Sequence, residues 1–254
     1  MIEPRRRFLL GALALTTPAW TSASMAASAL APIRMGYFDS YWPFSRKIGS
    51  SSVAGALVDA VNLIGRKAGL PFEHFAYPWA RAQLMVERGD LDGFCTVRTQ
   101  ARLAYADFCP TPIVRVSYGI YHRVDDPRPL QVRSVEDLRQ FRQATYRGSG
   151  YAREHLEIDR MLIDNDEDSI LRRLASGDLD TFVEGEYVAA AKINELGLAN
   201  KIRFTPASFL PKAEFRFGLR RSCTDVKAVL AKVESTIQSV TKSGELGAVF
   251  KKYR

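Results

Sequence analysis

Apolar residues in the first hundred positions of this chain follow two alternating patterns. Some segments are short and apolar or alternate apolar with polar residues, as strands do, whereas others repeat apolar residues every three or four positions, as helices do. They follow the order strand, helix, strand, helix, strand: 33–38, 53–68, 72–77, 79–88 and 91–94. Gly69-Leu70-Pro71 predicts the end of the first helix. The order is typical of a parallel α/β sheet.

The alternation returns in the rest of the chain. The segments expected to form strands or helices are 114–122, 134–138, 158–163, 169–175, 202–204, 215–219 and 225–253. Gly177-Asp178-Leu179-Asp180 also repeats the pattern of Gly89-Asp90-Leu91-Asp92, each between a helix and a strand. A glycine at a helix end is common, so the repeat alone is a weak signal. Together with the alternation it predicts two similar α/β lobes.

The first thirty residues have the pattern of an export signal. Arg5-Arg6-Arg7-Phe8-Leu9 is followed by an uncharged run that includes Ala27-Ser28-Ala29. A basic start, a short apolar stretch and an A-x-A end predict a cleavable signal peptide over residues 1–29, and the twin arginines indicate a Tat-type address. The alternative is a membrane anchor, but the apolar core of residues 8–15 spans ~12 Å as a helix, against a hydrocarbon layer of about 30 Å. The sequence therefore predicts a periplasmic protein.

Composition and charge indicate an ordinary globular protein with a basic excess. Of 254 residues, 46% are hydrophobic and 25% are charged, and the formal net charge is +8. The basic residues are scattered among acidic ones rather than gathered in a block. Because an exported protein rarely meets nucleic acid, we predict no nucleic-acid partner and expect the charge to attract small anionic solutes. We also expect a monomer.

Cysteines and histidines form no metal-binding pattern. The three histidines are widely spaced and have no Cys or His partners nearby: His74, His122 and His155. We therefore predict no metal and no cofactor. Cys95 and Cys109 flank one loop and could pair in an oxidising compartment, which would leave Cys223 free. The sequence does not decide between this pair and three free thiols.

Several short motifs occur in an order that points to one family. They are Ile33-Arg34-Met35-Gly36, Gly89-Asp90-Leu91-Asp92, Thr99-Gln100-Ala101-Arg102, Asp107-Phe108-Cys109-Pro110-Thr111-Pro112, Gly148-Ser149-Gly150 and Ser243-Gly244-Glu245-Leu246. Over nearly all of residues 32–253 the chain resembles the bacterial extracellular solute-binding proteins of family 3, the amino-acid-type receptors of ABC importers. The resemblance implies a periplasmic-binding-protein-like α/β fold, with two lobes, a ligand cleft and two crossover hinge strands. Lobe 1 would hold residues 30–115 and 215–254, and lobe 2 residues 116–214.

Arg102 ends the Thr99-Gln100-Ala101-Arg102 motif, where the family places the arginine that binds the ligand's carboxylate. A guanidinium can hold a carboxylate through two parallel hydrogen bonds, which lysine cannot reproduce. The resemblance therefore implies a carboxylate-binding role for Arg102. It also implies ligand contacts a few residues earlier, at Cys95 and Thr96. The alternative for Arg102 is a surface ion pair.

Aromatic residues are expected to form the walls of the cleft. Trp79 falls where the family places an apolar or aromatic residue that stacks on the ligand, and Tyr41 matches an aromatic position after the first strand. Phe38 is a candidate by proximity. A flat ring offers a large contact area at little cost in conformational freedom. The alternative for Trp79 is a core residue at the start of a helix.

The second lobe is expected to contribute a glycine-rich turn and an acidic residue. Backbone N–H groups of Gly148, Ser149 and Gly150 could bind the same carboxylate as Arg102, although the alternative is an ordinary turn. Amino-acid receptors of the family usually carry an acid for the ligand's ammonium at the place that Gly185 occupies here. Glu184 is the candidate replacement. Otherwise the ligand lacks an α-ammonium group.

Together these features predict a periplasmic solute-binding protein. It would capture a small polar carboxylate-bearing solute, an amino acid or a related compound, and deliver it to an ABC permease in the inner membrane. No chemistry is needed, because selective binding and release are the whole function. Two alternatives remain open. One is an accessory or sensor-type binding protein, and the other is a dehydratase-like enzyme with an acid–base pair drawn from His155, Glu184 or Glu186.

Overall fold

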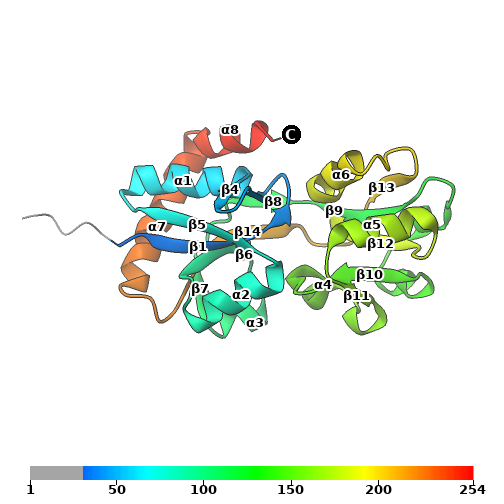
Figure 1. Cartoon of the computed structure of the whole chain (residues 1–254), viewed down its shortest axis with the longest axis horizontal. Helices are drawn as coiled ribbons and strands as arrows, with labels where there is room; N and C mark the ends of the chain where they lie inside the picture. Colours follow the sequence, from blue (N-terminus) through cyan, green and yellow to red (C-terminus); the bar gives the residue numbers. More distant parts are fainter. Residues whose placement is uncertain (1–30, 254) are drawn as a thin grey trace, which may run out of the picture. The chain divides into compact units, whose positions relative to one another are not determined.

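The computed structural model describes residues 31–253 and arranges the alternating strands and helices around two main sheets (Figure 1). The signal peptide predicted over residues 1–29 lies outside the described residues. The α/β class predicted from the sequence is confirmed. We call the first sheet with its helices the first lobe, and the second sheet with its helices the second lobe.

The first sheet has six strands in the order β5-β1-β6-β14-β7, with β8 paired to β14. The strands are β1 (Ile33–Phe38), β5 (Phe72–Tyr77), β6 (Gly93–Val97), β7 (Ala106–Phe108), β8 (Val114–Val116) and β14 (Ala213–Arg220). A small antiparallel ribbon follows β1 and consists of β2 (Ser40–Tyr41), β3 (Ser45–Ile48) and β4 (Ser52–Ala54). Strands β1, β5 and β6 are parallel, whereas β14 is antiparallel to β6 and β7. The strand that completes this sheet therefore comes from the far end of the chain.

Helices cover both faces of the first sheet (Figure 1). They are α1 (Ala56–Ala68), α2 (Trp79–Arg88), α3 (Gln100–Leu103), α7 (Val226–Lys242) and α8 (Glu245–Lys251). On one face, Val61 and Ile64 of α1 are fully buried in the main hydrophobic core. On the α2 side, Val86 packs in a separate buried cluster with Leu91 and Phe94. Burial on both faces fits the mostly apolar sequences of β1 and β6, whereas the edge strand β5 also carries Glu73 and His74.

The second sheet has five strands in the order β11-β10-β12-β9-β13. The strands are β9 (Tyr118–Arg123), β10 (Gln143–Tyr146), β11 (Leu162–Asp164), β12 (Thr181–Gly185) and β13 (Ile202–Pro206). The helices are α4 (Gly150–His155), α5 (Glu167–Ser176) and α6 (Glu186–Glu195), with short 3-10 helices at Arg128–Gln131, Glu136–Gln140 and Ile158–Arg160. Strands β10, β11 and β12 are parallel, and β9 is antiparallel to β12 and β13. The second sheet thus repeats the layout of the first.

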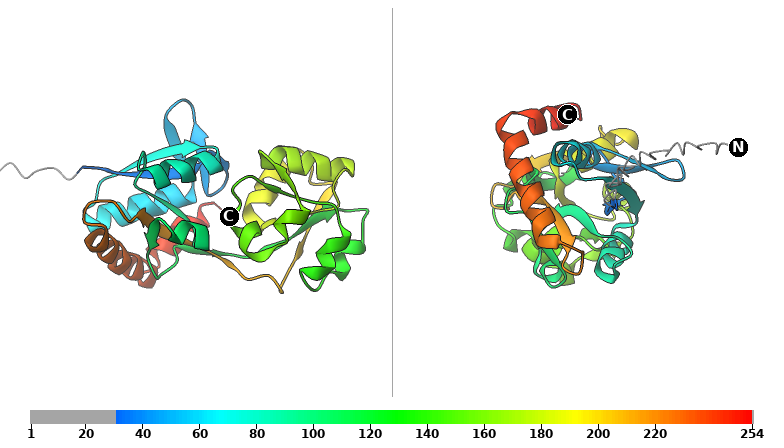
Figure 2. Two further views of the ribbon diagram at one scale, coloured as in Figure 1. Left: turned by 90° about the horizontal axis from the view of Figure 1, so that it is seen from below. Right: turned by 90° about the vertical axis from the view of Figure 1, so that its left-hand side faces the viewer.

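The chain passes between the sheets twice (Figure 2). The first passage lies between Val116 and Tyr118 and the second between Pro206 and Ala213. The single segment predicted at 114–122 is therefore two strands that belong to different sheets. The predicted lobe boundaries, after residues 115 and 214, fall inside β8, one residue before its end, and inside β14. That the lobes move as separate bodies stays a prediction.

Two predicted helices have different bounds in the structure. The helix expected over 53–68 begins at Ala56, because Gly55 adopts φ +135 and a Cβ there would lie 2.4 Å from the carbonyl oxygen of Phe44. The preceding Val53 belongs to β4. The helix expected over 225–253 is broken into α7 and α8 at Gly244, which has a left-handed φ of +80. In both cases a glycine sets the helix boundary, and the spacing of apolar residues does not reveal it.

Cys95, Cys109 and Cys223 are free thiols, so the structure does not contain the disulfide that the sequence left open. Among residues 31–253, no helix has both the length and the apolar character that spanning a bilayer requires. Within the same range, His, Cys, Asp and Glu side chains form no group of three that could hold a metal ion.

Candidate ligand-binding site

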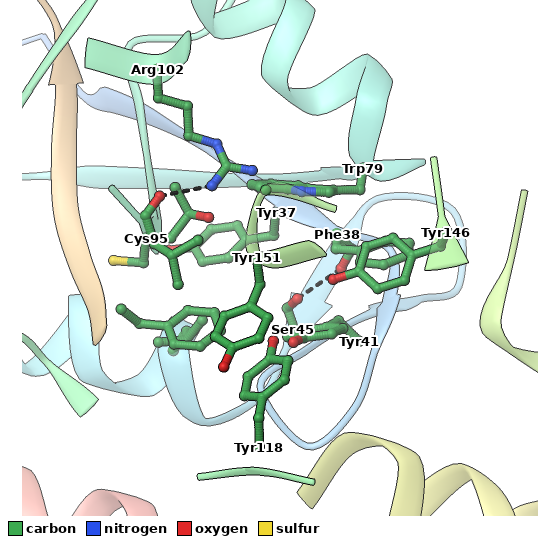
Figure 3. A pocket seen from close by; sticks show the side chains of 15 residues that line it. Tyr37, Phe38, Tyr41, Ser45, Trp79, Cys95, Arg102, Tyr118, Tyr146 and Tyr151 are labelled. Atoms are coloured by element: carbon green, nitrogen blue, oxygen red, sulfur yellow. Dashed lines mark hydrogen bonds between the residues drawn. The ribbon is translucent and has the colours of Figure 1, made fainter. Parts of the chain in front are cut away.

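A cavity lies where the ends of β1 and β6 meet β10 and α4 of the second lobe. It leaves about 30 Å³ of free volume, which is room for one or two water molecules. Fifteen residues line it (Figure 3): Tyr37, Phe38, Tyr41, Ser45, Leu57, Trp79, Cys95, Thr96, Val97, Arg102, Tyr118, Tyr146, Gly150, Tyr151 and Phe215. The wall therefore combines one guanidinium with many aromatic rings.

Arg102 is the central polar group of the cavity. It belongs to the short helix α3, whose N-cap Thr99 accepts a hydrogen bond from the Arg102 backbone N–H through its Oγ1, at 3.3 Å. The side chain is 2% exposed. Its Nη1 donates to the carbonyl oxygen of Val97 at 2.7 Å, and its Nε donates to Oε1 of Gln83 at 3.0 Å. The guanidinium carbon lies 5.3 Å from the ring centre of Trp79 (Figure 3).

The guanidinium of Arg102 has no carboxylate partner among the described residues, because every oxygen that it contacts is neutral. Burial disfavours the charged form and lowers the pKa of Arg102 to about 10. The side chain therefore remains a cation at neutral pH. A buried cation without a counterion is costly, and an anion that entered the cavity would remove this cost. The surface ion pair considered as an alternative for Arg102 is absent from the described residues.

The glycine-rich turn of the second lobe lies against this guanidinium. Gly150 lines the cavity, and a Cβ on it would lie 2.6 Å from Nη1 of Arg102. Ser149 caps α4 instead, since its side chain accepts from the backbone N–H of Ala152. Gly148 presents its carbonyl oxygen, which accepts from Nε2 of Gln83 at 3.2 Å and from Nη2 of Arg102 at 3.5 Å. Gly148 and Ser149 are therefore close to the predicted site but do not line the cavity.

The aromatic side chains of the wall come from both lobes. Phe38 stacks on Tyr41 with ring centres 5.5 Å apart and on Trp79 at 6.3 Å, and its ring centre lies 5.5 Å from that of Tyr146. The resemblance pointed to Tyr41 and Trp79, and proximity pointed to Phe38; all three line the cavity. Trp79 is also only 9% exposed, so it belongs both to the wall and to the core. Five aromatic residues were missed: Tyr37, Tyr118, Tyr146, Tyr151 and Phe215.

Cys95 and Thr96 lie on β6 and contribute to the wall, as the resemblance implied. Burial raises the pKa of the Cys95 thiol, so the side chain is a neutral, weakly polar group. Together with Phe38, Tyr41, Trp79, Arg102 and Gly150, they make seven of the ten predicted residues that the structure brings together around one cavity.

Glu184 is buried behind the wall rather than in it. It is 1% exposed, and its Oε1 accepts hydrogen bonds from the Tyr41 hydroxyl at 3.0 Å and from the Gly185 backbone N–H at 2.7 Å. Burial raises the pKa of Glu184 from its ordinary 4.5 to about 7. Gly185 does not line the cavity either. The structure therefore does not bring Glu184 to the position expected for a ligand-binding acid.

The sequence of the chain matches the model of a known protein family. The model for bacterial extracellular solute-binding proteins, family 3, matches residues 33–254. The chain belongs to this family. No curated protein sequence matches this solute-binding protein significantly.

Solved structures share the fold of this solute-binding protein. A histidine kinase sensor domain with similarity to periplasmic binding proteins has a TM-score of 0.73 and 22% identity, with 87% of this chain and 95% of that chain covered. The substrate-binding protein of an amino acid ABC transporter has a TM-score of 0.70 and 18% identity, over 88% and 99%. The arginine-, lysine-, histidine-binding protein ArtJ from Geobacillus stearothermophilus has a TM-score of 0.72 and 16% identity, over 88% and 95%. They confirm the periplasmic-binding-protein fold.

The three residues considered for a dehydratase-like acid–base pair do not line the cavity of this solute-binding protein. His155 packs its ring against Tyr151 with centres 4.7 Å apart and lines a neighbouring cavity. Glu184 lies behind the wall, and Glu186 begins α6 without lining the cavity. Within the described part of the chain, the cavity wall therefore contains no acid–base pair from the three candidates.

The buried Glu184 predicts a pH dependence of stability. Because its pKa is raised in the folded protein, the native state binds more protons than the unfolded state between pH 4.5 and 7. The stabilising contribution is therefore complete below pH 4.5 and is lost as the pH rises through about 7. The neighbouring Glu167 acts in the same direction, since burial and the charge of Glu184 raise its pKa, whereas Lys192 opposes this rise.

The measurement compares the wild type with Glu184→Gln by urea unfolding between pH 5 and 8. We expect the free energy of unfolding of the wild type to fall by ~3 kcal/mol relative to the variant over this range. The variant serves as the control for titrating groups that do not interact with Glu184; Glu167 is not among them, because the charge of Glu184 raises its pKa. Parallel curves for the two proteins would show that Glu184 titrates as an ordinary carboxylate.

Proposed function

We propose that the protein captures a small carboxylate-bearing solute between its two lobes and delivers it to the permease of an ABC importer. The observation that supports this is the buried guanidinium of Arg102, which meets neutral oxygens only. A carboxylate fits the two-pronged geometry of a guanidinium and would neutralise its charge. In this proposal the predicted Tat-type signal exports the chain to the periplasm, where it acts as a monomer without catalysing a reaction.

Contacts across the cleft connect binding with closure of the lobes. Tyr41 of the first lobe donates to Glu184 of the second, and Gln83 donates to Gly148. Farther out, Arg46 of β3 forms an ion pair with Glu195 of α6. We infer that these contacts form when the lobes close and separate when they open. A ligand that binds both lobes shifts this equilibrium toward the closed state.

A thermal-shift screen with amino acids, other monocarboxylates, dicarboxylates and amines tests the proposal. Ligands that bind only the native state raise its melting temperature by mass action. We expect carboxylates, and not simple amines, to stabilise the protein. The shift should disappear in Arg102→Met and persist in Arg81→Met, a matched control whose arginine lies outside the cavity on α2 and packs on Tyr77. Stabilisation by amines alone would contradict the proposal.

Trp79→Leu should weaken binding of any carboxylate found in this screen. Leucine retains apolar bulk but removes the flat surface beneath Arg102 and the stacking partner of Phe38. Losing a cation–π contact and a stacked ring should cost ~1–2 kcal/mol of binding free energy, a decrease in affinity of roughly 5- to 30-fold. Isothermal titration calorimetry measures this change. Equal affinities would show that Trp79 serves only the core.

A sensor-type or accessory role is the second candidate. It is favoured by the fold shared with a histidine kinase sensor domain. Both roles use the same ligand-induced closure and differ in the partner that recognises the closed protein. Permease and ATPase genes beside this one would support import, whereas a neighbouring sensor kinase gene would support the alternative.

A further inference from the structure

The wall of the cavity carries a single charge. Of its fifteen residues only Arg102 is charged at neutral pH, and eight have aromatic rings. From this wall we propose that the site selects monocarboxylates with a flat apolar body and discriminates against α-amino acids. The inference rests on the proposed function, because it names the ligand class of the same site.

Glu184, the acid nearest to the wall, already has hydrogen-bond partners. Its Oε1 accepts from the Tyr41 hydroxyl and from the backbone of Gly185. Since Tyr41 is part of the wall and Glu184 is not, the carboxylate is separated from the cavity by a side chain that it binds. An ammonium group in the cavity would therefore not contact Glu184 in this arrangement.

Other acids of the neighbourhood do not reach the cavity. Asp39 follows Phe38 but is not part of the wall. Glu154 lines the neighbouring cavity, where it accepts from the backbone N–H of Gln100 at 3.0 Å. A bound α-amino acid would pair its carboxylate with Arg102 and leave its ammonium without an acidic partner among the described wall residues. Burying an unpaired charge is costly, so the same molecule without its ammonium should bind better.

The rings of the wall favour a flat ligand body. Phe38 and Trp79 stack with ring centres 6.3 Å apart and an interplanar angle of 24°. Tyr118 and Tyr151 stack with ring centres 3.6 Å apart at 17°. The free volume in this arrangement is only about 30 Å³, so a ligand can fit only if the lobes or the side chains of the wall move apart. A planar body needs the smallest such movement, and it gains ring contacts on its faces.

Matched ligand pairs that differ only in the ammonium group test the inference. The pairs are 3-phenylpropionate with phenylalanine and 4-methylpentanoate with leucine, and benzoate serves as the smallest flat probe. In isothermal titration calorimetry at pH 7.5, we expect each acid without the ammonium to bind at least about tenfold more tightly than its amino acid. We also expect 3-phenylpropionate to bind more tightly than 4-methylpentanoate. Phenylalanine binding as tightly as 3-phenylpropionate would overturn the inference.

Two variants separate this inference from the proposed function. Glu184→Gln should leave the ratio of the two affinities in each pair unchanged, whereas a selective loss of amino-acid binding would show that Glu184 holds the ammonium and overturn the inference. Arg102→Met should abolish binding of both members. If the carboxylates bind through Arg102 but the amino acids bind more tightly, only this inference fails. If no carboxylate binds and Arg102→Met has no effect, the proposed function fails as well.

Discussion

Arg102→Met should abolish carboxylate binding while the ligand-free protein stays folded. The variant removes the one positive charge of the cavity wall, together with the guanidinium N–H groups that could donate to both oxygens of a carboxylate. Truncating one partner of a buried, hydrogen-bonded charge pair costs about 3 kcal/mol or more, which corresponds to a loss of affinity of roughly 100-fold or more. Calorimetric titration of the wild type and the variant with the best carboxylate measures this loss.

In the same variant, two opposing effects act on the stability of the ligand-free protein. Methionine loses the hydrogen bonds to Val97 and Gln83, but it also removes a buried cation without a counterion. Because these effects oppose each other, we expect the free energy of unfolding without ligand to change by less than about 2 kcal/mol. Arg102→Lys keeps the positive charge but cannot donate two parallel hydrogen bonds to one carboxylate, so its affinity should fall at least about tenfold. Full binding by Arg102→Met would exclude the guanidinium as the carboxylate site.

Gly150→Ala should weaken ligand binding clearly, although less than the loss of the arginine. The added methyl group would lie 2.6 Å from Nη1 of Arg102, 2.8 Å from Nη2 and 2.8 Å from Cγ2 of Thr99. The guanidinium must therefore move out of its position, or the second lobe must stay farther from the first. Either change misplaces the groups that bind the carboxylate. We expect a loss of about 2 kcal/mol in binding free energy, or roughly 30-fold in affinity.

Gly247→Ala is the matched control for this variant. Gly247 lies in α8, and a Cβ there meets no atom within 4 Å. In a helix interior alanine is favoured over glycine, so the control should keep its affinity and be as stable as the wild type or slightly more so. Equal affinities for Gly150→Ala and Gly247→Ala would mean that Gly150 does not contact the guanidinium of Arg102 in the ligand-bound protein.

The sequence predicted correctly those helices and strands that are bounded by proline or glycine. The predicted segments 33–38, 72–77 and 79–88 coincide with β1, β5 and α2. Pro71 and Pro78 precede two of these elements, and Gly89 ends the helix in the left-handed conformation. These residues restrict the backbone by themselves, so they can be read without knowing the rest of the fold.

Elements without such boundaries were missed. Helix α6 starts directly after β12, and its N-cap Gly185 makes no side-chain cap hydrogen bond. The ribbon of β2, β3 and β4 has strands of two to four residues, too short to show a period. Both depend on packing against other parts of the chain for their stability. Periodicity alone could not have found them.

Sequence motifs pointed to several residues that line the cavity, whereas most lining residues outside those motifs were missed. Arg102 and Trp79 belong to recognisable local patterns, and both line the cavity. Tyr118, Tyr146 and Tyr151 lie on β9, β10 and α4, and only the passage of the chain between the sheets brings them opposite the first lobe. Tyr146 could have been predicted as a lining residue, because ligands bind at the carboxyl ends of parallel strands and this residue ends β10.

The position of β14 has a consequence for the order in which the molecule can form. This strand lies between β6 and β7, so residues 93–97 and 106–108 pair with residues that are synthesised more than a hundred positions later. A nascent chain can assemble the complete second sheet while the first sheet still lacks its fourth member. Contacts so distant along the chain slow folding. Newly made molecules should therefore pass through an intermediate in which β6 has one unpaired edge and β7 has no partner strand, and this intermediate is where aggregation is expected.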